Sequence, residues 1–473
     1  MKKVISGILI AVLLFTMLPM EACMAANSED WLKDYTYFVA TRYYEALDST
    51  EMKSEEVLYL TNYHGEAESL YIPATATVEG KNLPVYLAPQ ESGSLWKSGA
   101  SKLKSITFEE GVKIGDNHAP NLFAGLTKLE SVNAGALDVT NQEGLQGMFT
   151  GCENLKKLDL SSWNTSNVTS LFDLFGGCKK LESVDLSNWD TSKVTNFTSV
   201  FEWCQSLYDF DVSNWDTSSA ETFLFMFYHC NQIRSLDLHK WNTSNVTDFA
   251  EMFGRCYNLE SINVSGWDTK KATTVAGMFT NNYSLTSLDV SSFDLSNIEV
   301  KMGDDNFLLR TGSLKKIKTP KNLSVTLFAG GLTYKASSGK KYTNLPKAKK
   351  SMTLTAVNEK TKTPKITKAT TTKGKINLKW SKISASNSWE HTDYEVQVST
   401  DKNFKKLVGK IKYIANPEAE TIGWWNYESV ILDRTNTVVT GLTSGKTYYV
   451  RVRATQYDKL NSSWSKVKKI KVK

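Results

Sequence analysis

The residue types that most often carry out chemistry in proteins are scattered along this 473-residue chain. None of its histidines has the spacing of a metal-binding motif or of a nucleophile and its base, and no glycine-rich phosphate loop is present. His229 stands beside Cys230, but the equivalent cysteines of neighbouring repeats have no histidine neighbour. We therefore expect no catalytic residue, no metal or cofactor site, and a protein that is not an enzyme. The five histidines are His64, His118, His229, His239 and His391.

One polar row is a better candidate for ligand contact. Side chains at one position of stacked strands lie about 4.8 Å apart, so neighbouring carboxylates repel by roughly 1 kcal/mol in water before screening. The functional interpretation is a ladder that binds cations, basic groups or hydroxyl-rich ligands. The structural interpretation is that flanking serines donate hydrogen bonds to it, while repeat duplication copies the residue. The row consists of Asp159, Asp185, Asp211, Asp237, Asn263 and Asp289.

Two sets of tryptophans could also contact a ligand. Trp424 and Trp425 lie outside any repeat, and they could stack on a sugar or pack onto their own domain. The other set recurs every 26 residues, and Phe293 in its sixth position favours burial of the whole row. That row is Trp163, Trp189, Trp215, Trp241 and Trp267.

These candidates are positioned by a 26-residue unit that repeats between Phe149 and Phe293. A fixed period of about 20 to 50 residues is the signature of a solenoid. Leu155, Leu158 and Leu160 have the spacing L-x-x-L-x-L, which predicts a short strand with its leucines inward. A single unit cannot bury its apolar edge, so the fold must come from stacked neighbours.

The second half of each unit has apolar residues three and four positions apart, at Val168, Leu171 and Phe175. This spacing predicts a short helix. We therefore expect an α/β solenoid with parallel strands on a concave face and short helices opposite.

Cysteine follows the same period, which argues against a disulfide framework. Of the six cysteines, Cys23 lies in the first 26 residues, which we expect to be removed as a signal peptide. The remaining five are an odd number, whereas the cysteines of a secreted disulfide scaffold are even in number and irregularly spaced. We expect a ladder of buried thiols, with partial oxidation between neighbouring coils as the alternative. The cysteines are Cys152, Cys178, Cys204, Cys230 and Cys256.

The repeats resemble the BspA-type leucine-rich repeat proteins of bacterial surfaces, whose pattern is L-x-x-L-D-L-S-x-W-D-T-S-x-V-T-x-x-x-x-M-F. The resemblance implies a secreted or surface-exposed interaction protein, often an adhesin, and it names no ligand. The M-F end of the pattern occurs at Met148-Phe149, Met226-Phe227, Met252-Phe253 and Met278-Phe279.

The first residues predict export. Lys2 and Lys3 precede the apolar run Val4 to Leu18 and the small residues Ala25 and Ala26, as in a secretory signal peptide over residues 1–26. Lipidation at Cys23 is the alternative, which a preceding glutamate disfavours. No later apolar run approaches the length of about 20 residues that a membrane span needs, so we expect a secreted or cell-surface protein without a transmembrane segment.

The rest of the chain divides into caps, array, linker and a last domain. Asp30 to Ala46 could form an amphipathic helix, and the alternating apolar residues after it predict strands. The expected parts are an N-terminal helix and β-rich cap over 27–87, leucine-rich repeats over 88–300, a β-rich C-terminal cap over 301–357, a linker over 358–364 and a final domain over 365–473.

The final domain resembles a fibronectin type III module, an all-β sandwich. Ile376, Leu378 and Trp380 alternate as in one strand, and Trp380 and Tyr448 would be its core tryptophan and its tyrosine corner. Such modules accompany both adhesins and secreted glycan-degrading enzymes.

Charge is unevenly distributed, although the chain carries only +6 overall. Between Gly312 and Trp380 lysines are frequent and Glu359 is the only acidic residue. This region could attach to an anionic cell-wall polymer or be an ordinary solvated surface; nucleic acid is not an expected partner of a secreted chain. We expect an adhesin-like binding protein that recognises an extracellular protein or glycan. The alternative is an accessory carbohydrate-binding protein that uses Trp424, Trp425 and the basic cap.

Overall fold

The computed structural model describes most of the chain after the first 29 residues. The described ranges are 30–45, 52–89, 95–96, 100–117, 119–298, 306–329, 331–357, 360–383, 392–405, 407–408, 412–413, 435–456 and 460–473. The expected signal peptide, His118, His391, Trp424 and Trp425 lie outside them.

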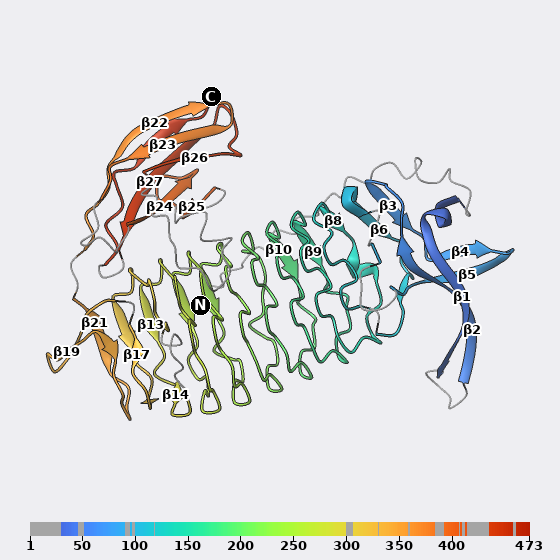
Figure 1. Cartoon of the computed structure of the whole chain (residues 1–473), viewed down its shortest axis with the longest axis horizontal. Coiled ribbons are helices and arrows are strands. Elements are labelled where there is room, and N and C mark those ends of the chain that lie inside the picture. Colours follow the sequence, from blue (N-terminus) through green and yellow to red (C-terminus); the bar gives the residue numbers. More distant parts are fainter. Residues whose placement is uncertain are drawn as a thin grey trace, which may run out of the picture.

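The first described residues lead into a β-sheet. The predicted helix over Asp30 to Ala46 is therefore wrong. A single 3-10 turn, η2 (Asp30–Asp34), leads into β1 (Tyr35–Glu45), which pairs antiparallel with β2 (Met52–Tyr63). Aromatic and β-branched residues dominate β1, and these favour a pleated strand over a helix. Figure 1 shows the hairpin projecting at the end of the molecule opposite the C-terminal cap. The sheet continues through β5 (Lys81–Leu87) to β4 (Thr75–Val78), and β7 (Lys113–Ile114) also pairs with β5.

The repeats form a solenoid with one short strand in most coils. Successive coils pair in parallel, and the register places Asp185 opposite Asp159 and Asn263 opposite Asp237. The first coils contribute β3 (Ser69–Ile72), β6 (Ser105–Phe108) and β8 (Ser131–Val132), with η3 (Ala100–Lys102) and η4 (Ala134–Ala136) beside them. The later coils contribute β9 (Lys157–Asp159), β10 (Ser183–Asp185), β11 (Ser235–Asp237), β12 (Ser261–Asn263) and β13 (Ser287–Asp289).

The predicted helices opposite the strands are wrong as well. Each coil has two residues with positive φ there, such as Asp173 (55°) and Gly177 (72°), and a right-handed helix cannot contain them. Backbone hydrogen bonds run between coils instead of within a helix, as from Phe175 N–H to the carbonyl oxygen of Val200 (2.9 Å). The array is a β-solenoid, with turns where helices were expected.

The core of the solenoid is built from ladders of identical residues. The repeated phenylalanines stack with ring centroids 5.2 to 5.8 Å apart. The repeated tryptophans are buried, as predicted, and stack nearly in parallel at 6.0 to 6.4 Å. Each repeated cysteine is buried and unoxidised, and its thiol donates to a phenylalanine carbonyl 29 residues earlier. Asn282 follows the cysteines in the next coil and donates to Phe253 O in the same way.

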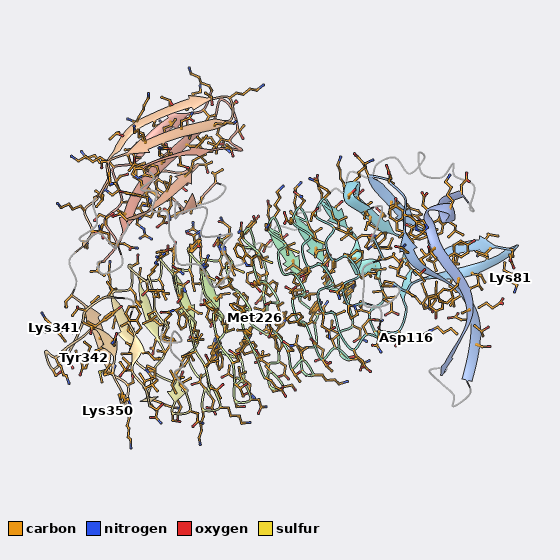
Figure 2. The ribbon with its side chains drawn as sticks, viewed as in Figure 1. Lys81, Asp116, Met226, Lys341, Tyr342 and Lys350 are labelled. Carbon is orange, nitrogen blue, oxygen red and sulfur yellow. The ribbon has the colours of Figure 1, made fainter. Side chains whose placement is uncertain are left out.

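A mixed sheet closes the far end of the solenoid. β13 pairs with β15 (Lys316–Lys318), and the sheet continues through β21 (Thr353–Ala356), β18 (Tyr334–Ala336) and β19 (Lys341–Tyr342). Figure 2 shows Lys341 and Lys350 of this lysine-rich cap at the outer end of the molecule. Short pairs complete it: β14 (Asp294–Leu295) with β16 (Asn322–Leu323), and β17 (Leu327–Phe328) with β20 (Asn344–Leu345).

The last domain has two β-sheets and a core of its own, which includes Trp380, Tyr394 and Tyr448. It stands beside the last coils of the solenoid (Figure 1). The segment predicted as a linker is held against it, since Lys360 pairs with Leu460 and Thr361 is buried. One sheet contains β22 (Ile366–Thr372), β23 (Lys375–Trp380) and β26 (Asn436–Val439); the other contains β25 (Lys412–Tyr413), β24 (Asp393–Ser399), β27 (Thr447–Thr455) and β28 (Lys468–Lys471).

Candidate functional site

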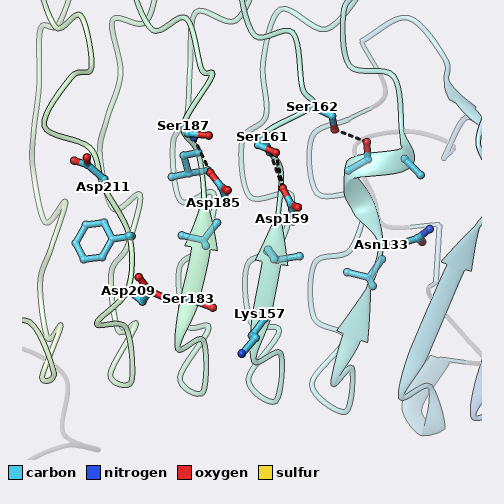
Figure 3. A pocket seen from close by; sticks show the side chains of 17 residues that line it. Asn133, Lys157, Asp159, Ser161, Ser162, Ser183, Asp185, Ser187, Asp209 and Asp211 are labelled. Carbon is cyan, nitrogen blue, oxygen red and sulfur yellow. Dashed lines mark hydrogen bonds between the residues drawn. The ribbon is translucent and has the colours of Figure 1, made fainter. Parts of the chain in front are cut away.

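The predicted carboxylate row lies on the strand-bearing face and borders a hollow of about 770 Å³. Asp159, Asp185 and Asp211 line it, and each is exposed to solvent. Figure 3 shows these carboxylates side by side on successive coils, at the carboxyl ends of the strand positions. The row is therefore accessible to a ligand, and whether it binds one stays a prediction.

Each carboxylate of the row also has a structural role in its own turn. Asp159 Oδ1 accepts hydrogen bonds from Ser161 N–H (3.1 Å) and Ser161 Oγ (2.7 Å). In the same way, the backbone N–H of Ser187 donates to Asp185 Oδ1 (3.0 Å). The backbone N–H of Ser265 donates to Asn263 Oδ1 (3.2 Å). This is the serine arrangement that the structural interpretation required. In each turn, one side-chain oxygen of the row accepts the backbone N–H two residues later, and the side-chain oxygen of asparagine can do so as well as that of aspartate.

Hydrogen bonding of this kind stabilises the ionised form. The backbone N–H of Ser213, followed by its hydroxyl, lowers the pKa of Asp211. His239 lowers the pKa of Asp237 through a side-chain hydrogen bond. The lowered pKa values keep Asp211 and Asp237 negatively charged near neutral pH.

The row is divided into two halves by its ion pairs. In the half toward the C-terminal cap, Asp237 Oδ1 contacts His239 Nδ1 (2.7 Å) and Asn263 Nδ2 (2.8 Å), while Asp289 pairs with Lys318 (2.7 Å). In the other half, no cation among the described residues pairs with the carboxylates that border the hollow. The negative charge beside the hollow is thus carried by Asp159, Asp185 and Asp211 of the row and by Asp209, and Lys157 also lines the hollow.

A second hollow, of about 920 Å³, lies between the solenoid and the last domain. Tyr208 is the most exposed large apolar side chain of the described residues, at 62%, and it lines this hollow. Half-buried Phe210 lines both hollows. From the last domain, Lys405 and Leu407 complete the lining.

The last domain is fixed to the solenoid by a buried polar junction. The Arg453 guanidinium donates to the carbonyl oxygen of Tyr283 (3.0 Å) and to Ser313 Oγ (3.0 Å), and it forms an ion pair with the fully buried Glu395. Asn461 Nδ2 donates to the same two oxygens, at 3.0 Å each. Because these bonds join the domains at several points, the second hollow has a defined shape.

Sequence reasoning missed Tyr208, Phe210 and Arg453. The two aromatic residues carried a readable signal, since they break the repeat pattern at strand positions that hold charged and aliphatic residues in the neighbouring copies. Arg453 had no such signal, because its partner Tyr283 lies 170 residues earlier.

Two further observations concern chemistry and membranes. Within the described ranges, no group of three or more histidine, cysteine, aspartate or glutamate residues could hold a metal ion. Over those same residues, no helix has the length and apolar character needed to cross a bilayer.

Comparisons with known proteins find a match to a family model and similarity to a solved structure. The family described as "Mycoplasma protein of unknown function, DUF285" matches residues 118–236 and 205–304, which is the array and less than half of the chain. The crystal structure of a leucine rich cell surface protein from Faecalibacterium prausnitzii A2-165 is similar at 16% identity, over 62% of this chain and 90% of that one. Its TM-score is 0.23, too low for an argument about fold or function. No curated protein matches the sequence.

Proposed function

We propose that this chain is a non-catalytic binding protein of the cell surface or the extracellular space, which recognises a protein or glycan partner through the strand-bearing face of its solenoid. The observation that carries the proposal is the row Asp159, Asp185 and Asp211, which lies unpaired beside a hollow on a rigid array. A partner would contact the row by several polar bonds at the repeat spacing of about 4.8 Å.

Repetition supports binding over catalysis. Acid–base catalysis by carboxylates needs two groups whose environments push their pKa values apart. Here Asp159, Asp185 and Asp211 each accept a hydrogen bond from the serine two residues later, and all three are exposed. Such a row offers several equivalent weak contacts and no pair of carboxyl groups that could act separately as acid and base.

We also propose a fibronectin type III assignment for residues 365–473. The Tyr448 hydroxyl accepts the backbone N–H of Thr443 (2.9 Å), as a tyrosine corner would. Trp380 packs against Tyr394 inside the domain, as a core tryptophan would. Together with the resemblance of the array to BspA-type repeats, this supports an adhesin-like surface protein. The lysine-rich cap could hold it on an anionic cell-wall polymer.

Asparagine substitutions test the row without damaging its turns. The full chain would be incubated with an extracellular-matrix protein panel and a glycan array, at low and moderate salt. Asp185→Asn with Asp211→Asn removes two charges and keeps the turn acceptor that Asn263 already demonstrates. The matched control is Asp237→Asn with Asp289→Asn, where both carboxylates already have side-chain partners, His239 and Lys318.

Loss of a specific partner with the first pair and retention with the control would support the proposal. Equal loss with both pairs would show that only overall charge matters. Binding that ignores both pairs would contradict a site on this face.

A further inference from the structure

The segment 207–215 departs from the corresponding segments of the array at two positions, 208 and 210, on either side of Asp209. Tyr208 occupies a position that is charged in the neighbouring coils, and Phe210 occupies a position that is aliphatic there. Repeat duplication copies residues without regard to function. Residues that differ from the repeat pattern are therefore more informative about function than residues that follow it. The neighbours of Tyr208 in this column are Lys156, Glu182, Arg234 and Glu260, and those of Phe210 are Leu158, Val184, Leu236 and Ile262.

The backbone changes at the same place. β9 pairs with β10 and β11 pairs with β12, but between these two sheets the only bridge among the described residues joins Ser183 to Asp209. Phe210 turns partly toward the core, with its ring 5.4 Å from that of Phe201 and 6.1 Å from that of Phe227. The ring of Tyr208 faces water, because its position points away from the core, as it does for the charged residues at the equivalent positions of neighbouring coils.

The hollow around Tyr208 is basic. Among the described residues, Lys156, Lys180, Arg234 and Lys405 line it, together with one carboxylate, that of Glu182. Lys156 and Arg234 have carboxylate partners outside the lining, at 3.0 Å and 2.9 Å. Lys180 donates to Asn154 Oδ1, but no carboxylate of the described residues pairs with Lys180 or Lys405, so the charges of these two cations are not neutralised.

The side of the hollow formed by the last domain is held in place. Arg451 lies between the rings of Phe404 (4.0 Å) and Trp464 (4.2 Å), which fixes the turn that carries Lys405. Val408 N–H donates to Val398 O (2.9 Å) and ties the end of this segment to β24. The junction at Arg453 then fixes the domain on the solenoid.

We propose that this hollow binds an acidic oligosaccharide of the uronate type. This inference rests on the proposed function and names a ligand class for the same face. The apolar face of one sugar ring stacks on Tyr208 and removes both surfaces from water. Carboxylates of the neighbouring sugars pair with Lys180 and Lys405. Ser206, Gln232 and Ser235, which also line the hollow, donate to and accept from the sugar hydroxyls.

An acidic peptide fits this lining less well. Apart from the two aromatic residues, most of the described lining residues are polar or charged. Of the three aliphatic ones, Ile233 and Leu236 are buried, and Leu407 is half-buried. A peptide bound with sequence preference would need apolar pockets for its side chains. A flat exposed ring surrounded by amide, hydroxyl and ammonium groups suits a flat, hydroxyl-rich anion.

Titration calorimetry on the full chain tests the proposal, with a galacturonate oligosaccharide of about six sugars as probe. Maltohexaose serves as the neutral probe and poly-L-glutamate as the peptide polyanion. Tyr208→Lys is the decisive variant. It introduces a residue that the array already uses at this position in Lys156, so the fold is preserved, and it adds a positive charge while removing the ring.

We expect Tyr208→Lys to weaken uronate binding by about tenfold or more despite its added charge, and Tyr208→Phe to retain binding within about threefold. Lys180→Gln with Lys405→Gln should also weaken it by about tenfold or more. The matched control, Lys335→Gln with Lys341→Gln, removes two cap lysines and should have little effect.

Three results would overturn the proposal: unchanged or tighter binding by Tyr208→Lys, equally tight binding of poly-L-glutamate, or equal losses with the cap lysines. If the uronate fails to bind while a panel partner binds and depends on Asp185 and Asp211, this inference fails and the proposed function stands. If the uronate binds as expected while no panel partner depends on those carboxylates, the reverse holds.

Discussion

The solenoid carries carboxylates on two sides, and their electrostatics are opposite. On the strand-bearing face, hydrogen bonds from the turn lower the pKa of Asp211. On the opposite side, where the chain turns with positive φ, burial raises the pKa values of Asp173, Glu202 and Asp248. The pKa of Glu251 is raised furthest there, to about 7. The exposed acids recur at one position of the 26-residue unit, whereas the four buried acids are spread over three other positions.

The difference comes from what surrounds each carboxyl group. An exposed aspartate that accepts a backbone N–H gains a partner without losing water. Glu251 instead lies in the wall of turns, where its Oε2 is buried without a hydrogen-bond partner. It fits because Gly277 occupies the same position one coil later, and a Cβ there would collide with the carboxyl group. The exposed row is suited to contact a ligand, whereas the buried acids contribute to stability and its dependence on pH.

The largest effect should come from the buried ion pair of the junction. Arg453→Ala leaves the carboxylate of Glu395 buried without its cation, and breaking such a pair costs about 3–5 kcal/mol. We expect a loss of that size in the unfolding of the last domain, together with its release from the solenoid. Chemical denaturation and small-angle X-ray scattering would measure the two effects.

The double variant Arg453→Ala with Glu395→Ala is the control for this junction. Removing both charges avoids the buried, uncompensated carboxylate, so much of the stability should return. If the single variant stayed as stable and as compact as the native chain, the junction would not hold the domains together.

Glu251 should give the wall a pH dependence of its own. Burial raises its pKa from 4.5 to about 7, so its contribution is fully present below pH 4.5 and is lost as the pH rises through 7. The free energy of unfolding that is lost between pH 4.5 and a pH above 7 amounts to about 3 kcal/mol. Unfolding of the native chain and of Glu251→Gln at pH 5 and pH 8 would measure it, and we expect the variant to lose less stability at the higher pH.

Asp211→Asn on the exposed face is the matched control, because its effect has the opposite sign. The lowered pKa of Asp211 stabilises the native state at pH values above 3.8, the pKa of the unfolded state. This contribution to stability is lost as the pH falls through the lower pKa of the native state. This variant should behave like the native chain between pH 5 and pH 8. A parallel loss in both variants would remove the distinction between the two sides.

The ladders were predictable from the sequence, and the conformation between them was not. A 26-residue period places Phe175 on Phe201 and Trp163 on Trp189 whatever the coil looks like. The spacing of Val168, Leu171 and Phe175 fits a helix and a wall of turns equally well. What decides between them is the positive φ at residues such as Asp173 and Trp203, which are not glycines and carry no mark in the sequence.

The candidate site was predictable only in part. The alternation around Leu158 and Leu160 correctly placed Asp159 on the exposed side. It did not separate the paired half of the row from the unpaired half, because the partners Lys318 and Asn263 depend on the register of neighbouring coils. Tyr208 could have been found by looking for the exception to the pattern.

The smallest effect should come from the turns of the exposed row. Asp185→Ala removes the acceptor of the Ser187 N–H and should cost about 1 kcal/mol. Asp185→Asn keeps that acceptor and lowers the repulsion from Asp159 and Asp211, so its stability should stay within a few tenths of a kcal/mol of the native value. Denaturant unfolding at pH 7 would resolve the two variants. Equal costs for alanine and asparagine would mean that the charge stabilises the coil, and the row would then have a structural reason to be acidic without any ligand.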